Sequence, residues 1–264
     1  MTNSERAGLI LSISANVIWG LFPIYWEKLR GISSVDLVCH RIVWAFAFAF
    51  AFVCIRLVTS KKSERQKRIV AFASLVTWKT HALAALLITL NWLAFLWAVT
   101  NDRVLLSSLG YYINPLVNVL LGVLVLGEHL SSRRWIAIVL AAIGVTILSV
   151  AAGEIPWVSF LMAFSFAGYA LVKKRASLDA LDGLLIEMSV IVGPTLVYLL
   201  FLIDPNKGFF IRDDSGTALL LILGGLLTLL PLALFSAATR RIPLTLIGML
   251  QYVGPTLQFL VGRR

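Results

Sequence analysis

The chain has 264 residues, of which 59% are hydrophobic and 14% are charged, and its formal net charge is +10. Soluble domains are about 45–50% apolar and about 25% charged, so this composition excludes an ordinary water-soluble fold. Uninterrupted apolar runs of about 20 residues predict an all-α membrane protein, because helices satisfy their own backbone groups in lipid. Most of the basic residues lie in loops, which argues against a nucleic-acid partner and for contact with the lipid bilayer.

Nine apolar segments are predicted to span the membrane as helices. In chain order they are residues 8–26, 36–58, 80–99, 104–126, 133–150, 157–173, 183–203, 217–238 and 245–262. The segment 36–58 contains an alternating Ala-Phe stretch with a strand period. It lies inside one long apolar run, so we interpret it as helix.

Basic residues in the loops predict how these spans are oriented. They concentrate after the second, fourth, sixth and eighth spans, in the stretches 61–68, 133–134, 173–175 and 240–241. Such loops are cytoplasmic in most membrane proteins, which puts the N-terminus in the cytoplasm and the protein in the plasma membrane, the inner membrane of a bacterium. The run 59–68 is otherwise interpreted as a solvated loop. Nine spans leave Arg263 and Arg264 outside, so we expect a missing tenth helix.

Two copies of one residue pattern lie 140 positions apart. The first copy is Tyr112, Pro115, Asn118 and Gly122, and the second is Tyr252, Pro255, Gln258 and Gly262. The shared offset predicts two related units, residues 1–150 with five spans and residues 151–264 with four. Bundles built from inverted repeats are typical of membrane carriers, whose substrates bind where the repeats meet.

Polar and aromatic residues within the spans are the candidate substrate-binding residues. Pro115 and Pro255 are expected to kink their helices and to free the carbonyls of Tyr111 and Gln251 for other partners. The alternatives are that the prolines only shape packing and that the aromatic residues are ordinary core. The predicted substrate contacts are Trp19, Asn91, Trp92, Tyr112, Asn118, Gln251 and Tyr252.

Three ionisable residues within the spans are candidates for charge coupling: His40, Arg41 and Glu187. Ionisable groups are costly in lipid and often functional. One hypothesis is that Arg41 and Glu187 face a shared cavity, and the alternative is that both reach the membrane surface. His40 is either a proton relay or a hydrogen-bonded helix end. His81 and His129 are predicted to be interface residues.

Small residues recur at every fourth position of the sixth span, at Ser159, Ala163 and Ala167. This spacing predicts close approach of a neighbouring helix. The chain contains no recognisable metal, nucleotide or hydrolase motif, so neither a cofactor nor an enzymatic activity is expected. A lipid-modifying enzyme would require clustered His, Asp or Glu side chains. No feature of the sequence predicts an oligomeric state.

Four stretches carry a resemblance to a known family: residues 16–26 (NVIWGLFPIYW), 40–44 (HRIVW), 127–145, which opens Gly-Glu-His-Leu, and 251–256 (QYVGPT). They resemble the EamA-type carriers of the drug/metabolite transporter superfamily, in particular the RarD group. The resemblance implies two inverted five-helix repeats with both ends cytoplasmic, and transport of small metabolites or drugs by alternating access. RarD proteins are linked by name to chloramphenicol sensitivity.

The sequence departs from the family pattern in its second half. The Gly-Glu motif that would close the second repeat, and the tenth helix after it, are not found after the ninth predicted span, 245–262. A secondary transporter with a small-molecule substrate is the function that the residues and the resemblance favour. The alternatives are a non-transporting membrane sensor or partner subunit, and a truncated, inactive carrier.

Overall fold

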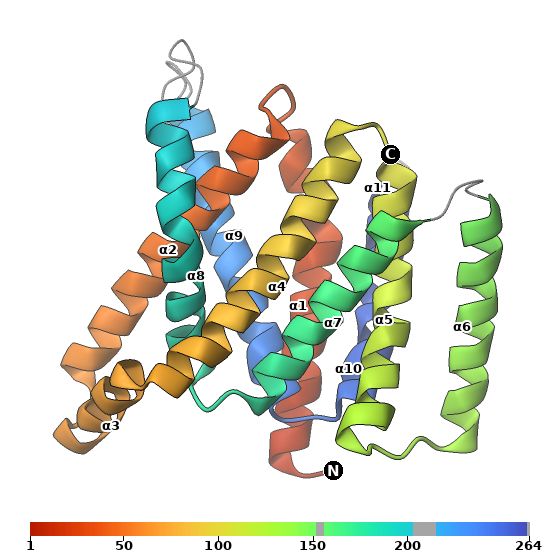
Figure 1. The fold of residues 1–264 in the computed structure, drawn as a ribbon, viewed down its shortest axis with the longest axis horizontal. Helices are drawn as coiled ribbons and strands as arrows, with labels where there is room; N and C mark the ends of the chain where they lie inside the picture. The colour runs from red at the N-terminus through yellow and green to blue at the C-terminus, as the bar shows by residue number, and fades with distance from the viewer. Residues whose placement is uncertain (152–155, 203–214, 263–264) are drawn as a thin grey trace. The chain divides into compact units, whose positions relative to one another are not determined.

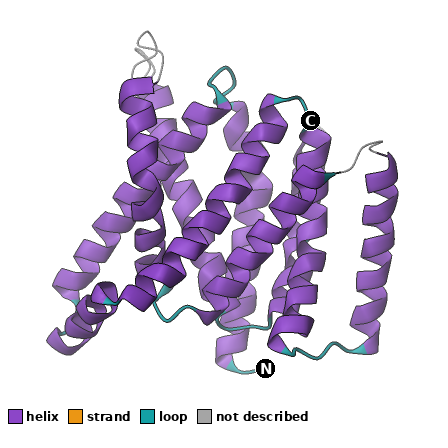
Figure 2. Cartoon of the chain, viewed as in Figure 1, coloured by secondary structure: helices purple, strands orange, loops and turns teal. Residues whose placement is uncertain are grey.

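The computed structural model describes residues 1–151, 156–202 and 215–262, and the ordered elements in these ranges are helices (Figures 1 and 2). They are α1 (Asn3–Glu27), α2 (Ser34–Thr59), α3 (Lys62–Ala73), α4 (Leu75–Thr100), α5 (Val104–Leu126), α6 (Ser132–Ala151), α7 (Trp157–Arg175), α8 (Ala180–Val197), the π-helical turn η1 (Tyr198–Leu202), α9 (Ser215–Thr239), α10 (Leu244–Gln251) and α11 (Val253–Gly262). The prediction of an all-α protein, with the Ala-Phe stretch in a helix, is confirmed.

Eight helical segments within the described residues are long and apolar enough to cross a membrane. They are α1, α2, α4, α5, α6, α8 with η1, α9, and α10 with α11. The sixth predicted span corresponds to α7, a 19-residue helix that carries Lys173, Lys174 and Arg175 in its last turn and is not among the eight. A multi-pass membrane protein is therefore confirmed, and the count of nine spans is not.

The prediction of a solvated loop at residues 59–68 is wrong in one respect, because most of this segment belongs to the helix α3. Its first half is basic, but Ile69, Val70 and Phe72 follow Arg68 and supply apolar residues for a short amphipathic helix. Arg68 is not fully solvated either. Its side chain is 16% exposed and lies 2.6 Å from a carboxylate oxygen of Asp182.

The chain forms two compact units. Unit 1 comprises Met1–Ile24, Leu86–Arg175 and Leu234–Arg264, and unit 2 comprises Tyr25–Ala85 and Ala176–Ala233. Each unit therefore takes residues from both sides of position 150. The division into repeats 1–150 and 151–264 stays a prediction.

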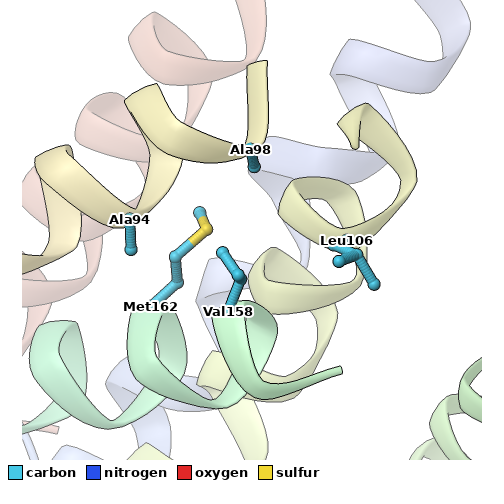
Figure 3. Packing of buried hydrophobic residues seen from close by; sticks show 5 residues of the cluster. All are labelled: Ala94, Ala98, Leu106, Val158 and Met162. Atoms are coloured by element: carbon cyan, nitrogen blue, oxygen red, sulfur yellow. The ribbon is translucent and has the colours of Figure 1, made fainter. Parts of the chain in front are cut away.

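Unit 1 is organised around the contact between α5 and α7. Ala163 and Ala167 are fully buried against α5. The hydroxyl of Ser159 donates a 2.6 Å hydrogen bond to the carbonyl of Leu106. The predicted close approach at these small residues is confirmed. Beside them, α4, α5 and α7 form a second apolar cluster, whose members are Ala94, Ala98, Leu106, Val158 and Met162 (Figure 3).

Helix α6 lies at the edge of unit 1 and packs on α5 (Figure 1). Most of its apolar side chains are exposed, including Ile136, Leu140 and Ile147. A helix with this surface requires an apolar solvent such as lipid.

Unit 2 is built on α2 packed against α8 and η1. Ion pairs support this packing: Arg56 on α2 lies 2.8 Å from Asp179 and 3.5 Å from Asp182. At the other end of α2, in its first turn, Asp36 accepts a 2.9 Å hydrogen bond from the Tyr198 hydroxyl of η1.

Candidate functional site

The junction of α5 with α10 and α11 in unit 1 contains four of the seven predicted substrate-binding residues. Its close packing depends on Gly248 of α10. A Cβ atom at Gly248 would lie 2.6 Å from the carbonyl oxygen of Pro115 and 3.1 Å from the Cβ of Asn118. Only a glycine allows the two backbones to approach so closely, which brings the polar side chains of both helices into contact.

Asn118 and Gln251 form the polar centre of this junction. The Asn118 amide nitrogen donates to the Gln251 side-chain oxygen at 2.5 Å and lies 3.3 Å from the side-chain oxygen of Asn114. Asn118 is fully buried and Gln251 is 5% exposed. The side-chain oxygen of Asn118 has no hydrogen-bond partner among the described residues. A buried acceptor without a donor is costly, so this oxygen is suited to bind a donor group from outside the protein.

Tyr112 and Tyr252, which are equivalent residues of the repeated pattern, lie opposite each other at the same junction. Their ring centroids are 6.5 Å apart, and the Tyr252 hydroxyl lies 3.4 Å from the Tyr112 carbonyl oxygen. Both side chains are partly buried. The two rings therefore place aromatic surface in the same junction as the buried amides.

The backbone differs between the two copies of the pattern. Helix α5 runs through Pro115 without interruption, and its predicted kink stays a prediction. In the second copy the helix is interrupted at Tyr252, between α10 and α11. Pro255 then occupies the first turn of α11, where a missing N–H breaks no hydrogen bond within the helix.

Trp19 belongs to an aromatic cluster on the α1 side of unit 1. Its ring centroid lies 5.8 Å from that of Phe166 and 5.6 Å from that of Phe235. Its carbonyl accepts a 3.0 Å hydrogen bond from Gln258 of α11. Trp19 thus lies beside α11, the helix that follows Tyr252.

Asn91 and Trp92 lie on α4, and the hydrogen bond of Asn91 leads to α7. The Asn91 amide donates a 2.8 Å hydrogen bond to the carbonyl of Met162, so it links α4 to α7. This is the interhelical bond that a buried asparagine in lipid requires. Trp92 is partly buried and, one residue on, projects about 100° around α4 from Asn91. Their role in substrate binding stays a prediction.

The charge-coupling candidates lie in unit 2. Glu187 of α8 is fully buried, and its carboxylate lies 2.7 Å from Nδ1 of His81 on α4. His81 is 1% exposed, so it lies inside the protein, and its predicted place at the membrane interface stays a prediction. Hydropathy placed it near a span end, whereas the structure packs it against α8. His129 is exposed, and its predicted place at the membrane interface stays a prediction.

Arg41 has a different environment from Glu187. Its Nε donates a 2.8 Å hydrogen bond to the Thr228 hydroxyl, and its guanidinium lies 5.1 Å from the centre of the Trp26 ring. The preceding residue, His40, is fully buried. The shared cavity of Arg41 and Glu187 stays a hypothesis.

Sequence reasoning missed the role of Glu128 and Lys174 in unit 1. The Glu128 carboxylate accepts hydrogen bonds from the backbone N–H groups of Leu244 (2.7 Å) and Thr245 (2.8 Å), which open α10. The Lys174 ammonium donates to the Ile242 carbonyl at 2.7 Å and lies 3.8 Å from Glu128. A carboxylate at a helix N-terminus is stabilised by the unpaired N–H groups there. The sequence drew attention to the Gly127-Glu128 stretch, but it did not indicate that Glu128 would bond to the start of α10.

Comparison with known proteins identifies the family. A model of the EamA-like transporter family matches residues 6–150, more than half of the chain. The chain belongs to the EamA-like transporter family. It is 40% identical over 265 residues to the uncharacterized transporter YojE of Bacillus subtilis, covering 97% of this chain and 85% of that protein. It is 38% identical over 262 residues to Protein RarD of Streptomyces exfoliatus, covering 98% and 81%.

The fold of this EamA-like transporter also resembles that of a protein of known crystal structure. The TM-score is 0.69 at 16% sequence identity, and the match covers 96% of this chain and 88% of that one. This likeness concerns the fold alone. The family model and the sequence relatives identify a membrane transporter of the EamA and RarD type rather than an enzyme.

Proposed function

We propose that this EamA-like transporter is a secondary carrier that moves small metabolites or drugs across the plasma membrane by alternating access. Its substrate would bind at the junction of α5 with α10 and α11. The observation that carries this proposal is the buried Asn118–Gln251 pair beside the interruption at Tyr252. In carriers, discontinuous helices supply polar backbone and side-chain groups within the membrane, where substrates bind.

The chemistry of the junction favours an amphiphilic substrate. The Asn118 oxygen offers a buried acceptor for a hydroxyl or N–H group. Tyr112 and Tyr252 offer aromatic faces on which a ring or an alkyl group can pack. Small-molecule sites commonly combine mostly apolar walls with a few polar groups that fix orientation.

Alternating access requires two segments that can change their relative positions. In unit 1, α10 is tied to α5 by the side-chain bond of Gln251, and α11 is tied to α1 by the bond of Gln258 to Trp19. A relative movement of α1 and α5 would therefore concentrate at Tyr252, where the helix is already interrupted. Such a movement would open and close the polar centre.

The proposal is tested by flux through the purified chain in liposomes. The first probe is radiolabelled chloramphenicol, followed by compounds whose cell-to-medium ratio changes when the protein is overproduced. We expect saturable flux for the wild type, loss of at least tenfold in Asn118→Ala, and wild-type flux in Thr146→Ala. Thr146 is the matched control because its hydroxyl donates to the Ala142 carbonyl within its own helix, α6, and it is exposed.

Two results would contradict the proposal. Equal flux in Asn118→Ala and in the wild type would show that the substrate does not bind at this junction. Absence of flux for every compound, with the protein folded in the membrane, would favour a sensor or a partner subunit.

A further inference from the structure

We propose that helix α3 lies in the membrane–water interface and binds anionic lipid headgroups through its basic side chains. This binding is independent of the proposed carrier function. The helix has 12 residues and lies between the end of α2 and the start of α4, which are both long and apolar enough to cross a membrane (Figure 1). Only Ser60 and Lys61 separate it from α2, and only Ser74 separates it from α4. With connections this short, α3 cannot leave the membrane surface at which α2 ends.

The protein itself gives α3 little support. No residue of this helix is buried. Toward unit 2, Arg68 pairs with Asp179 and Asp182, and Ala71 and Phe72 are half-buried. An isolated helix of about 12 residues is only marginally stable in water, so α3 requires a further surface on which to pack.

Four large apolar residues are exposed where α3 meets α4. Ile69 and Val70 of α3 and Leu75 and Val76 of α4, which we call the apolar corner, are 51–74% exposed. Apolar side chains gathered this closely are unfavourable in water. At the level where lipid headgroups meet acyl chains, the same side chains would lie in hydrocarbon.

Trp78 of α4 adds an aromatic side chain to the apolar corner. Its indole N–H donates a 2.8 Å hydrogen bond to the carbonyl of Phe72, in the last turn of α3. That carbonyl is one of those that a helix leaves unpaired at its C-terminus. The residue is 39% exposed, so it combines a satisfied N–H with accessible apolar surface. Tryptophan in such a position is typical of a membrane interface.

The basic residues of this segment precede the apolar corner. Between residues 61 and 68 the exposed basic residues are Lys61, Lys62, Arg65 and Lys67, and Glu64 is the acid. Four positive charges and one negative charge give these five residues a net charge of +3. Each Lys or Arg near an anionic membrane surface strengthens binding by about fivefold. Long basic side chains can reach the headgroup phosphates while the apolar corner lies deeper.

Helix geometry gives α3 one side toward the protein and one side away from it. Residues 62, 66, 69 and 73 follow one another at helical spacing, so they form one stripe, and all four are exposed. The half-buried residues 68, 71 and 72 lie on the opposite side. The exposed stripe begins with Lys62 and Gln66 and ends with Ile69 and Ala73. An anionic bilayer offers charge and then hydrocarbon in the same order, which favours lipid over a soluble acidic partner.

The depth of α3 is tested with nitroxide labels on the protein in phosphatidylcholine–phosphatidylglycerol nanodiscs. In a background with Cys39 and Cys54 replaced by serine, single labels are attached to Ile69→Cys and Lys62→Cys, which lie on the same stripe. We expect the Ile69 label to be relaxed mainly by oxygen, which concentrates in hydrocarbon. The Lys62 label should be relaxed mainly by a water-soluble nickel complex.

Two further positions provide the references for depth. Leu140→Cys, on the exposed side of the spanning helix α6, reports a lipid-facing label, and Lys28→Cys, in an exposed loop, reports a label in water. The Ile69 label should resemble the label at Leu140. An Ile69 label that resembles the label at Lys28 would overturn the proposal and point to a soluble partner for α3.

Lipid binding by charge is tested with a fluorophore on Gln66→Cys in the same background. Phosphatidylglycerol or phosphatidylcholine that carries a nitroxide near the headgroup quenches the fluorophore when the lipid is next to α3. We expect phosphatidylglycerol to quench at least about fivefold more effectively at low salt. The preference should largely disappear in about 1 M salt, where the Debye length is about 3 Å. Equal quenching by the two lipids at low salt would overturn the proposal.

A set of charge variants shows whether α3 itself selects the lipid. Replacement by glutamine of Lys61, Lys62, Arg65 and Lys67 together should abolish the preference for phosphatidylglycerol. Arg133→Gln with Arg134→Gln is the matched control, because both arginines are exposed and belong to unit 1. This control should keep the preference. A preference that survives the fourfold replacement would overturn the proposal, and if that variant does not fold, the salt dependence of the wild type decides.

Discussion

Asn118 of α5 and Gln251 of α10 are joined by a hydrogen bond of 2.5 Å across 133 residues of sequence. Both amides are buried in unit 1. Side-chain hydrogen bonds between helices in membranes contribute about 0.6 kcal/mol on average and up to about 1.7 kcal/mol. This bond therefore serves stability as well as the proposed binding site, and the two roles can be separated.

The stability role predicts a non-additive pair of substitutions. Asn118→Ala and Gln251→Ala should each lower the free energy of unfolding by about 1–3 kcal/mol, because each leaves a buried partner unsatisfied. The double variant should lose less than the sum, by about 1 kcal/mol. Unfolding in mixed micelles measures this, with Thr146→Ala in combination with Asn118→Ala as the control, because Thr146 bonds within α6. Strict additivity of the first pair would show that the bond is not formed in the membrane.

Gly248 predicts a second effect on the same junction. Gly248→Ala should destabilise the protein by about 1–3 kcal/mol, because its methyl group would overlap the Pro115 carbonyl and Asn118. Gly144→Ala, in α6, should be neutral or stabilising by up to about 1 kcal/mol, since its Cβ position is open and alanine favours helix. The same unfolding assay compares the two. Equal stabilities would contradict the close approach of α10 to α5.

Glu128 is predicted to hold the start of α10. Glu128→Ala should cost about 1–2 kcal/mol, because the N–H groups of Leu244 and Thr245 lose their acceptor. Glu128→Gln keeps one acceptor oxygen and should cost less. Hydrogen exchange of the α10 amides measures the local effect. Protection of these amides that is the same in Glu128→Ala and in the wild type would rule out the carboxylate as their acceptor.

The Arg68–Asp182 ion pair predicts a change in proteolysis of α3. Asp182→Asn weakens the contact that holds Arg68, so trypsin should cut after Arg68 about fivefold faster, as expected for a loss of about 1 kcal/mol at a partly exposed site. Cutting after Lys62, which is exposed, provides the internal control and should not change. Acceleration at both sites alike would indicate general unfolding instead.

The loop charges predict sidedness that labelling can check. In a background with Cys39 and Cys54 replaced by serine, Lys62→Cys and Arg133→Cys should react with an impermeant maleimide only from the cytoplasmic side. Lys28→Cys should react only from outside. All three positions are exposed. Reaction of Lys62→Cys and Arg133→Cys from opposite sides would refute the predicted topology.

The helices and their order followed from the sequence because unbroken apolar runs leave little choice of structure in lipid. The pairings between helices did not. The repeated pattern correctly drew attention to Tyr112 and Tyr252, which lie opposite each other. The same pattern made Gln258 the equivalent of Asn118, yet Asn118 bonds to Gln251, because the interruption at Tyr252 changes which residues of the second copy face α5.

His81 shows what sequence reasoning lacked. Its position near the end of an apolar run is typical of an interface residue, and nothing local distinguishes it from His129. Its burial depends on Gly183, about 100 residues away, whose missing side chain makes room for the ring. Likewise, the charges of α3 predicted a solvated loop, because the sequence does not show that Arg68 pairs with Asp179 and Asp182, more than 100 residues away.

The capping of α10 by Glu128 has a mechanical consequence. The first residues of α10 are bonded to Glu128, which follows α5, and its last residue is bonded to Asn118 of α5. Helix α10 therefore has to move together with α5. The segment after Tyr252 is attached to α1 instead. Tyr252 thus joins a segment held by α5 to a segment held by α1. A residue with a more restricted backbone at this one position would hold the two segments in a single relative arrangement, at the cost of the Tyr252 contacts with Tyr112.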